Sequence, residues 1–282
     1  MDPIVGIDTS QYNWRTGVPF GMLPRLHAKG VRFLIARATI GTTPDPAFGH
    51  SRHRGTFRSW VPGGYHYLVE GLDPKAQADA FTQECARTGG IDGLNTALDV
   101  EDDNRPPVTN HPTSAAIAGW AKKWKDDHPK HQLGLYSNLA TWLRLGNPDA
   151  ASMGFDFLWQ ARWYVSDPSQ LPPAPPHGFG GLPTTLWQWG SLDLVGVSGN
   201  MLHLDGDAFY GSMDDLRALA AKEVTPVTDR PAYATSYNAT IAQALKALGA
   251  ITPATGGPAV VAGSTDALVA ATQAVTEQKL GR

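Results

Sequence analysis

The chain has 282 residues, of which 42% are hydrophobic, and its formal net charge is −3. That apolar content is enough for a large core, so the composition excludes a disordered chain and allows one barrel-sized domain or two ordinary ones. The charge and the lack of basic clusters argue against nucleic acid or anionic lipid as a partner. No apolar run approaches the length of a membrane-spanning helix, so we expect no membrane insertion.

The chain begins Met1-Asp2-Pro3, without the charged and apolar stretches of a secretion signal. We therefore expect a soluble protein that is made in the cytoplasm without a signal peptide. The single cysteine, Cys85, excludes an internal disulfide framework. It falls in a helical pattern over 76–86 with no activating basic partner apparent nearby, which predicts a buried thiol rather than a nucleophile.

Short β-rich runs alternate with helical patterns from the start of the chain to about Glu223. This alternation is typical of parallel strands that are joined by crossover helices. The predicted strands cover 4–8, 32–39, 64–68, 96–101, 133–137, 155–161, 185–189 and 203–207. Eight strands are what a closed barrel needs, so we predict an α/β fold of the TIM-like (β/α) barrel type.

Two helices of this barrel have clear starts. Asp73, followed by proline, opens one, and Thr113 opens another in which Trp120 and Trp124 recur at helical spacing and are expected in the core. Between 167 and 185 a run of prolines leaves no room for an ordinary helix. We therefore expect the last strands to lack full crossover helices, which makes the barrel irregular.

The sequence changes character after Glu223, where it becomes rich in alanine and threonine. We predict a barrel domain over 1–223, a linker over 224–232 and a small helical segment over 233–282. The two helical patterns of this segment have apolar stripes too narrow to be stable alone. We expect the segment to dock, to serve in targeting, or to assemble the chain into a homo-oligomer.

The strongest local signal is a buried-looking strand that ends in a burst of carboxylates, Ala97-Leu98-Asp99-Val100-Glu101. Residues two apart in a strand point the same way, so Asp99 and Glu101 share a face, with Cβ atoms roughly 6–7 Å apart. Two carboxylates this close resist ionising together, so one keeps a proton near neutral pH while the other is anionic. Cleavage of a glycosidic bond needs such a pair.

Asp-x-Glu at a strand end also occurs in NTPases, in metal sites and on ordinary surfaces. The phosphate-binding loop of an NTPase is absent from the chain. A barrel metallohydrolase would place paired histidines on a strand, whereas no predicted strand holds more than one histidine, as with the isolated His66. We expect neither a metal nor any other cofactor.

Other strand ends repeat the acidic theme. Asp8 lies at the end of the first predicted strand, and Asp205 lies in the last. Catalytic residues of barrels come from different strand ends, and the first and last strands are neighbours once a barrel closes. Each aspartate also has a plain structural role open to it, as a turn former or a helix cap. Aromatic residues, on which sugar rings stack, occur at similar places.

These features occur together in an order that resembles glycoside hydrolase family 25, the Chalaropsis-type lysozymes of bacteria, fungi and phages. The resemblance runs from Val5 to about Leu216. Its motifs are Gly6-Ile7-Asp8-Thr9-Ser10-Gln11, Gly64-Tyr65-His66-Tyr67, Gln77-Ala78 with Phe81, Leu98-Asp99-Val100-Glu101, Gly134-Leu135-Tyr136-Ser137, Leu158-Trp159-Gln160-Ala161, Leu186-Trp187-Gln188-Trp189, and Val197-Ser198-Gly199-Asn200 leading to Asp205.

The resemblance implies an irregular barrel that hydrolyses the β-1,4 bond between N-acetylmuramic acid and N-acetylglucosamine in peptidoglycan. It implies Glu101 as the general acid and Asp8, Asp99 and Asp205 as its acidic companions. Two roles stay open for Asp99, which either orients the N-acetyl group of the substrate as an internal nucleophile or attacks directly. The residues expected to bind substrate are Tyr65, Arg37, Tyr67, Tyr136, Trp163, Trp187 and Gln188. A wall-degrading enzyme without a signal peptide fits a phage endolysin.

Two departures from the family pattern stand out. Ala38-Thr39-Ile40-Gly41 lacks the acidic residue that often precedes glycine after the second strand, so a substrate contact is missing or replaced there. The last motif reads Asp205-Gly206-Asp207 where the family commonly has Asp-x-Asn, and we expect Asp207 to face solvent. Two other functions remain open: a glucosaminidase or chitinase on the same barrel, and a glycan-binding wall module without turnover.

Overall fold

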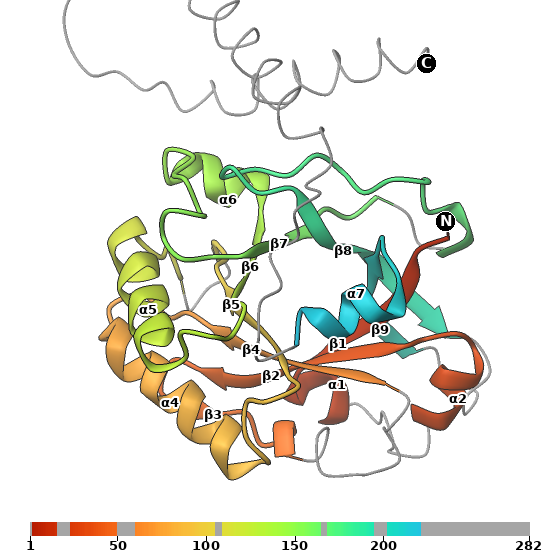
Figure 1. The fold of residues 1–282 in the computed structure, drawn as a ribbon, viewed down its shortest axis with the longest axis horizontal. Coiled ribbons are helices and arrows are strands. Elements are labelled where there is room, and N and C mark those ends of the chain that lie inside the picture. Colours follow the sequence, from red (N-terminus) through yellow and green to blue (C-terminus); the bar gives the residue numbers. More distant parts are fainter. Residues whose placement is uncertain are drawn as a thin grey trace, which may run out of the picture. The chain divides into compact units, whose positions relative to one another are not determined.

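A computed structural model describes residues 2–15, 23–49, 60–104, 109–164, 168–194 and 202–220 (Figure 1). The chain divides into two units, Met1–Asp229 and Arg230–Arg282. The predicted linker over 224–232 and the helical segment over 233–282 lie outside the described residues, so the proposals for them stay predictions. None of the helices in the described ranges is long and apolar enough to cross a membrane.

Eight strands close into a mixed barrel, which confirms the predicted fold class. In barrel order they are β1 (Ile4–Thr9), β2 (Phe33–Ile40), β4 (Val61–Tyr67), β5 (Asn95–Asp99), β6 (Gly134–Asn138), β7 (Phe157–Ala161), β8 (Thr184–Leu194) and β9 (Leu202–Phe209). The barrel closes because β1 pairs with both β2 and β9. A two-residue strand, β3 (Thr43–Pro44), forms a hairpin with β2.

The barrel strands β1, β2 and β4 to β8 run parallel, but β9 runs antiparallel to both of its neighbours, β8 and β1. The expectation of parallel strands therefore fails at the last strand. An antiparallel partner needs no crossover helix, since a short connection can return the chain directly. Among the described residues between β7 and β8, the one helix is the short 3-10 helix η3 (Pro168–Gln170), which agrees with the predicted irregularity.

Helices cover one side of the barrel where the chain crosses between parallel strands (Figure 1). The longest are α4 (Pro74–Arg87) and α5 (Ser114–Asp127), which pack against each other. Asp73 and Thr113 are their N-caps, as predicted, because each side chain accepts a hydrogen bond from a backbone N–H of the first turn. The shorter helices are α1 (Gln11–Arg15), α2 (Leu23–Ala28), α6 (Leu139–Arg144) and α7 (Met213–Ala218).

Alternation along the strands sorts side chains into two layers. Outward-facing residues pack under α4 and α5 in a core that holds Trp120, Trp124 and Cys85, all fully buried as predicted. Large apolar side chains such as Phe33 and Phe157 fill the barrel interior at the N-terminal ends of the parallel strands. The space left at the C-terminal ends is where polar residues gather.

Glycine makes room for these interior phenylalanines. A Cβ atom on Gly6 would lie 2.2 Å from the Phe33 ring, and one on Gly134 would lie 2.4 Å from the Phe157 ring. Both distances are far below van der Waals contact, so a larger residue would displace the ring. The two glycines therefore let the bottom of the barrel fill without voids.

His66 of β4 belongs to the outer layer, where it forms a structural network instead of a metal site. Its Nδ1 lies 2.6 Å from Thr39 Oγ1, its Nε2 lies 3.3 Å from Gln77 Oε1, and its ring stacks on Trp120. Gln77 also bonds the backbone of Val69 at both N–H and C=O. This network fixes the loop between β4 and α4, and burial lowers the pKa of His66 to about 3.

His66 should make the protein lose stability on acidification. The unfolded chain protonates this histidine below its ordinary pKa of 6.5, whereas the folded chain does so only near 3. The stability is therefore fully present above pH 6.5 and is lost as the pH falls toward 3. Between pH 7.5 and pH 5 this effect is worth about 2 kcal/mol.

Urea unfolding of wild type and His66→Gln at the two pH values measures this effect. The wild type should lose about 2 kcal/mol more than the variant on going to pH 5. Equal losses would show that His66 is not held neutral in the folded state.

Candidate active site

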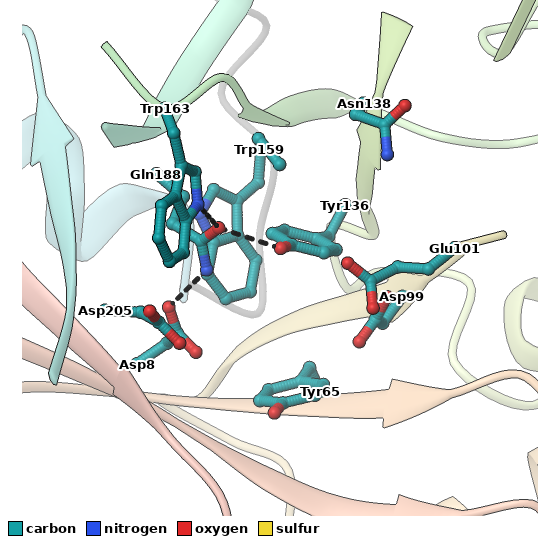
Figure 2. A pocket seen from close by; sticks show the side chains of 11 residues that line it. Asp8, Tyr65, Asp99, Glu101, Tyr136, Asn138, Trp159, Trp163, Gln188 and Asp205 are labelled. Carbon is teal, nitrogen blue, oxygen red and sulfur yellow. Dashed lines mark hydrogen bonds between the residues drawn. The ribbon is translucent and has the colours of Figure 1, made fainter. Parts of the chain in front are cut away.

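A cavity of about 490 Å³ opens at the C-terminal ends of the parallel strands (Figure 2). Eleven residues line it: Asp8, Tyr65, Asp99, Glu101, Tyr136, Asn138, Trp159, Ala161, Trp163, Gln188 and Asp205. All four predicted acids are among them, together with four of the seven predicted substrate-binding residues. Asn138, Trp159 and Ala161 were not predicted, although they follow the family motif residues or belong to them.

Strand register brings the acids together. Asp8 on β1 and Asp205 on β9 are directly opposed partners across the antiparallel pair that closes the barrel. Asp99 is the last residue of β5, and Glu101 follows two residues later. Figure 2 shows Asp8 beside Asp205 at one end of the cavity and Asp99 beside Glu101 at the other. The two pairs face each other across a space into which side chains from most of the barrel strands project.

Gln188 organises the Asp8 end. Its Oε1 accepts hydrogen bonds from the Tyr136 hydroxyl at 2.9 Å and from Trp163 Nε1 at 3.0 Å. These two donors fix which end of the amide is oxygen, so Nε2 must face Asp8, to which it donates at 2.8 Å. One amide thereby orients a carboxylate, a tyrosine and a tryptophan around the cavity.

The segment that carries Glu101 is held from three sides. Val100 N–H donates to the Tyr136 carbonyl, and Ser137 Oγ donates to the Val100 carbonyl. After Glu101, the Asp102 carboxylate pairs with Arg144 and lies 3.1 Å from His111 Nδ1. The position of Glu101 therefore depends on the strand end before it and on an ion pair after it.

Asn110 is the third support. Its Nδ2 donates to the carbonyls of Leu68 at 2.9 Å and Glu101 at 3.3 Å, and to the Tyr67 hydroxyl at 3.3 Å. Its Oδ1 accepts from Glu70 N–H at 2.8 Å, and only 2% of the residue is exposed. This one side chain joins the loop after β4 to the loop after β5.

Burial and mutual repulsion raise the pKa values of the aspartates. Burial raises the pKa of Asp99 well above its ordinary value, and the negative charge of Glu101 raises it further, against the opposing effect of Arg37. At the other end, burial and the charges of Asp207 and Asp205 raise the pKa of Asp8. Carboxyl groups arranged in this way hold protons at higher pH than free aspartates do, which favours general acid catalysis.

Asp207 is a correction to the sequence interpretation, which placed it in solvent. The residue is fully buried, and its Oδ1 accepts a hydrogen bond from Trp159 Nε1 at 2.8 Å. Burial raises its pKa well above the ordinary value. The reason is alternation, because Asp205 and Asp207 are two apart on β9 and so both face the barrel interior.

Three predicted substrate-binding residues lie outside the cavity wall. Trp187 faces outward, because it neighbours the inward-facing Gln188 on β8, and it packs with Ile7 in an outer core. Arg37 forms a buried ion pair with Asp45 at 2.9 Å. Tyr67 is held by Asn110, so sugar contact by these three stays a prediction.

The motif at 197–200 lies outside the described residues. Within the described ranges, no group of three or more His, Cys, Asp or Glu is arranged to hold a metal ion. The alternative of a barrel metallohydrolase therefore gains no support from the geometry.

A mixed α/β barrel with an acidic cavity at its C-terminal strand ends is an arrangement that glycoside hydrolysis can use. The model for "Glycosyl hydrolases family 25" matches residues 7–196. The chain belongs to this family, which confirms the resemblance that the motifs indicated. No curated protein sequence matches the chain significantly.

Several solved structures with a similar fold are described as muramidases or lysozymes. A muramidase from Trichobolus zukalii is 25% identical, with a TM-score of 0.56 over 77% of this chain and 98% of that one. A GH25 lysozyme from Aspergillus fumigatus is 22% identical, with a TM-score of 0.60 over 78% and 99%. The catalytic domain of endolysin ply40, from bacteriophage P40 of Listeria monocytogenes, is 21% identical, with a TM-score of 0.53 over 77% and 97%.

Asn110→Ala should destabilise the protein strongly, because it leaves the buried Leu68 carbonyl and the Glu70 N–H without their partner. The expected loss in the free energy of unfolding is about 3 kcal/mol. Asn95→Ala is the matched control, since Asn95 is equally buried but its side-chain Nδ2 and Oδ1 have no hydrogen-bond partner among the described residues. Chemical denaturation measures the free energy of unfolding of both variants. Equal losses of this free energy in Asn110→Ala and Asn95→Ala would contradict this role of Asn110.

Proposed function

We propose that the protein is a lysozyme, an N-acetylmuramidase that hydrolyses the β-1,4 bond between N-acetylmuramic acid and N-acetylglucosamine in bacterial peptidoglycan. The observation that carries this proposal is the ring of four carboxylates, Asp8, Asp99, Glu101 and Asp205, around one cavity at the barrel mouth. Family membership and the muramidases that share the fold support it. The partner is accordingly the glycan strand of the cell wall.

Glu101 is the proposed general acid. Its carboxyl O–H donates a proton to the glycosidic oxygen as the bond from that oxygen to the anomeric carbon breaks. Its backbone is held on both sides, by the Val100 contacts and by Asn110. The side chain of Glu101 therefore extends from a fixed backbone position at the cavity edge. A positioned acid of this kind accelerates bond cleavage without moving far.

Asp99 is proposed to stabilise the positive charge that develops at the anomeric carbon. It does so either by orienting the N-acetyl group of the substrate or by attacking the carbon directly. It lies next to Glu101 and is only 4% exposed. Asp8 and Asp205 add negative charge at the opposite end, where they stabilise an oxocarbenium-like transition state. Tyr65, Tyr136, Trp163 and Gln188 are proposed to position the sugars.

Trp163 is the best placed of these for stacking on a sugar ring. It is 65% exposed at the cavity edge, yet its indole N–H is anchored on Gln188. A large aromatic face that is both accessible and held in one orientation is what a sugar platform requires. Tyr136, by contrast, is buried and donates its hydroxyl proton to the same Gln188 oxygen.

Fragment analysis tests the bond that is cut. Purified peptidoglycan is digested, the products are reduced with borohydride, and the new reducing ends are identified by mass spectrometry. We expect reduced muramic acid termini from wild type and a loss of at least about 100-fold in rate with Glu101→Gln, since the variant has no proton to donate. Reduced glucosamine termini would show a glucosaminidase, and full activity of Glu101→Gln would refute its role.

The pH profile tests the pairing of Asp99 with Glu101. Burial and the negative charge of Glu101 raise the pKa of Asp99, so the two carboxyl groups titrate as one coupled pair. Removing one of the two charges removes their repulsion, so the proton that remains leaves at lower pH. The residual activity of Asp99→Asn should therefore have the basic limb of its kcat/KM profile shifted toward acid by about one pH unit. An unshifted limb would show that the two carboxyl groups titrate independently.

A further inference from the structure

The amide of Asn138 is fixed in one orientation and faces the cavity. Asn138 ends β6 and is the N-cap of α6, where its Oδ1 accepts a hydrogen bond from Thr141 N–H at 2.9 Å. A backbone N–H can bond only the oxygen of an amide, so this contact excludes the flipped orientation. Figure 2 shows the result, with Nδ2 on the side of Glu101 and Tyr136 and Oδ1 turned away.

Most hydrogen-bond donors of the described cavity residues already have acceptors. The Tyr136 hydroxyl and Trp163 Nε1 donate to Gln188 Oε1, and Gln188 Nε2 donates to Asp8. Trp159 Nε1 donates to the buried Asp207. These bonds shape the cavity but leave few N–H or O–H groups for a ligand.

The remaining donors in the described cavity are the Tyr65 hydroxyl, the second hydrogen of Gln188 Nε2, and the two hydrogens of Asn138 Nδ2. No protein acceptor within the described residues bonds Asn138 Nδ2. Asp8, Asp205 and Gln188 lie at one end of the cavity, whereas Asn138 lies at the Glu101 end (Figure 2). A ligand oxygen at the Glu101 end therefore has the Asn138 amide as a neutral donor, with the Tyr65 hydroxyl as its competitor.

The carboxyl groups at this end do not replace this donor, because the proton that the Asp99–Glu101 pair holds is directed at the glycosidic oxygen in the proposed mechanism. An ionised carboxylate only accepts hydrogen bonds, so it can bind sugar hydroxyls and amide N–H groups but not a carbonyl oxygen. The acetamido group of a peptidoglycan sugar presents just such a carbonyl oxygen. If it entered a cavity of acids without a donor, it would be desolvated and unpaired, which is costly.

From this arrangement we infer that Asn138 is a specificity-determining residue, which binds the acetamido carbonyl of the sugar on the leaving side of the scissile bond. The inference rests on the proposed function, because Glu101 must reach the leaving oxygen and so places the leaving sugar at its own end of the cavity. For a muramidase that sugar is N-acetylglucosamine. Asn138 would thus favour acetylated glycan over glycan that carries a free amine.

Variants at this position can separate binding from stability. Ser and Asp serve as N-caps about as well as Asn, so Asn138→Ser and Asn138→Asp keep the start of α6 but remove the amide donor. Asn138→Ala removes both functions and should show a lowered Tm, which the other two should not. Tyr65→Phe is the control for the competing donor.

The experiment compares kcat/KM on two forms of one purified peptidoglycan, before and after treatment with an N-acetylglucosamine deacetylase. Wild-type full-length protein should prefer the acetylated form by about tenfold, the value of one hydrogen bond to a desolvated group. Asn138→Ser should lose this preference, with a ratio close to one, and Tyr65→Phe should keep it. Asn138→Asp should favour the deacetylated form, since its carboxylate accepts hydrogen bonds from an ammonium group.

Three outcomes would overturn the inference: an unchanged ratio in Asn138→Ser, loss of the ratio in Tyr65→Phe, or no preference in wild type. Failure of the proposed function gives a different result. It would appear in the same digests as glucosamine reducing ends or as full activity of Glu101→Gln, whatever the ratio measured for Asn138→Ser.

Discussion

The pairing of β1 with both β2 and β9 is the constraint on which the site depends. Without closure, Asp8 would lie on an edge strand, far from the other acids in sequence and in space. With closure, Asp8 is directly opposite Asp205 and faces the end of β5 across the barrel. The barrel also has no free edge among these eight strands, so the backbone hydrogen bonds around its circumference are satisfied.

Burying several carboxylates in one cavity is unfavourable, and the structure limits that cost in specific ways. Gln188 donates to Asp8, Trp159 donates to Asp207, and the guanidinium of Arg37 favours the charged form of Asp99. Even so, the pKa values of all three aspartates are raised, so the compensation is incomplete. An incompletely stabilised set of acids retains protons that a catalytic site can use.

Rigid supports hold the reactive groups in the proposed mechanism. Strand ends fix Asp8, Asp99 and Asn138, whereas Glu101 lies just beyond a strand and relies on Asn110 and Asp102. The position of Glu101 therefore depends on side-chain contacts between two loops and not on strand pairing alone.

The sequence by itself determined the strand count, the caps at Asp73 and Thr113, the irregular end of the barrel and the four acids at its mouth. These features follow from local patterns, because periodicity and capping act over a few residues and strand ends repeat a motif. Only the tertiary structure decided that β9 runs antiparallel, that Asp207 is buried, that Trp187 faces outward and that Asn110 supports Glu101. Strand direction, register and the hydrogen-bond partners of a buried amide depend on residues distant in the chain, which local sequence does not specify.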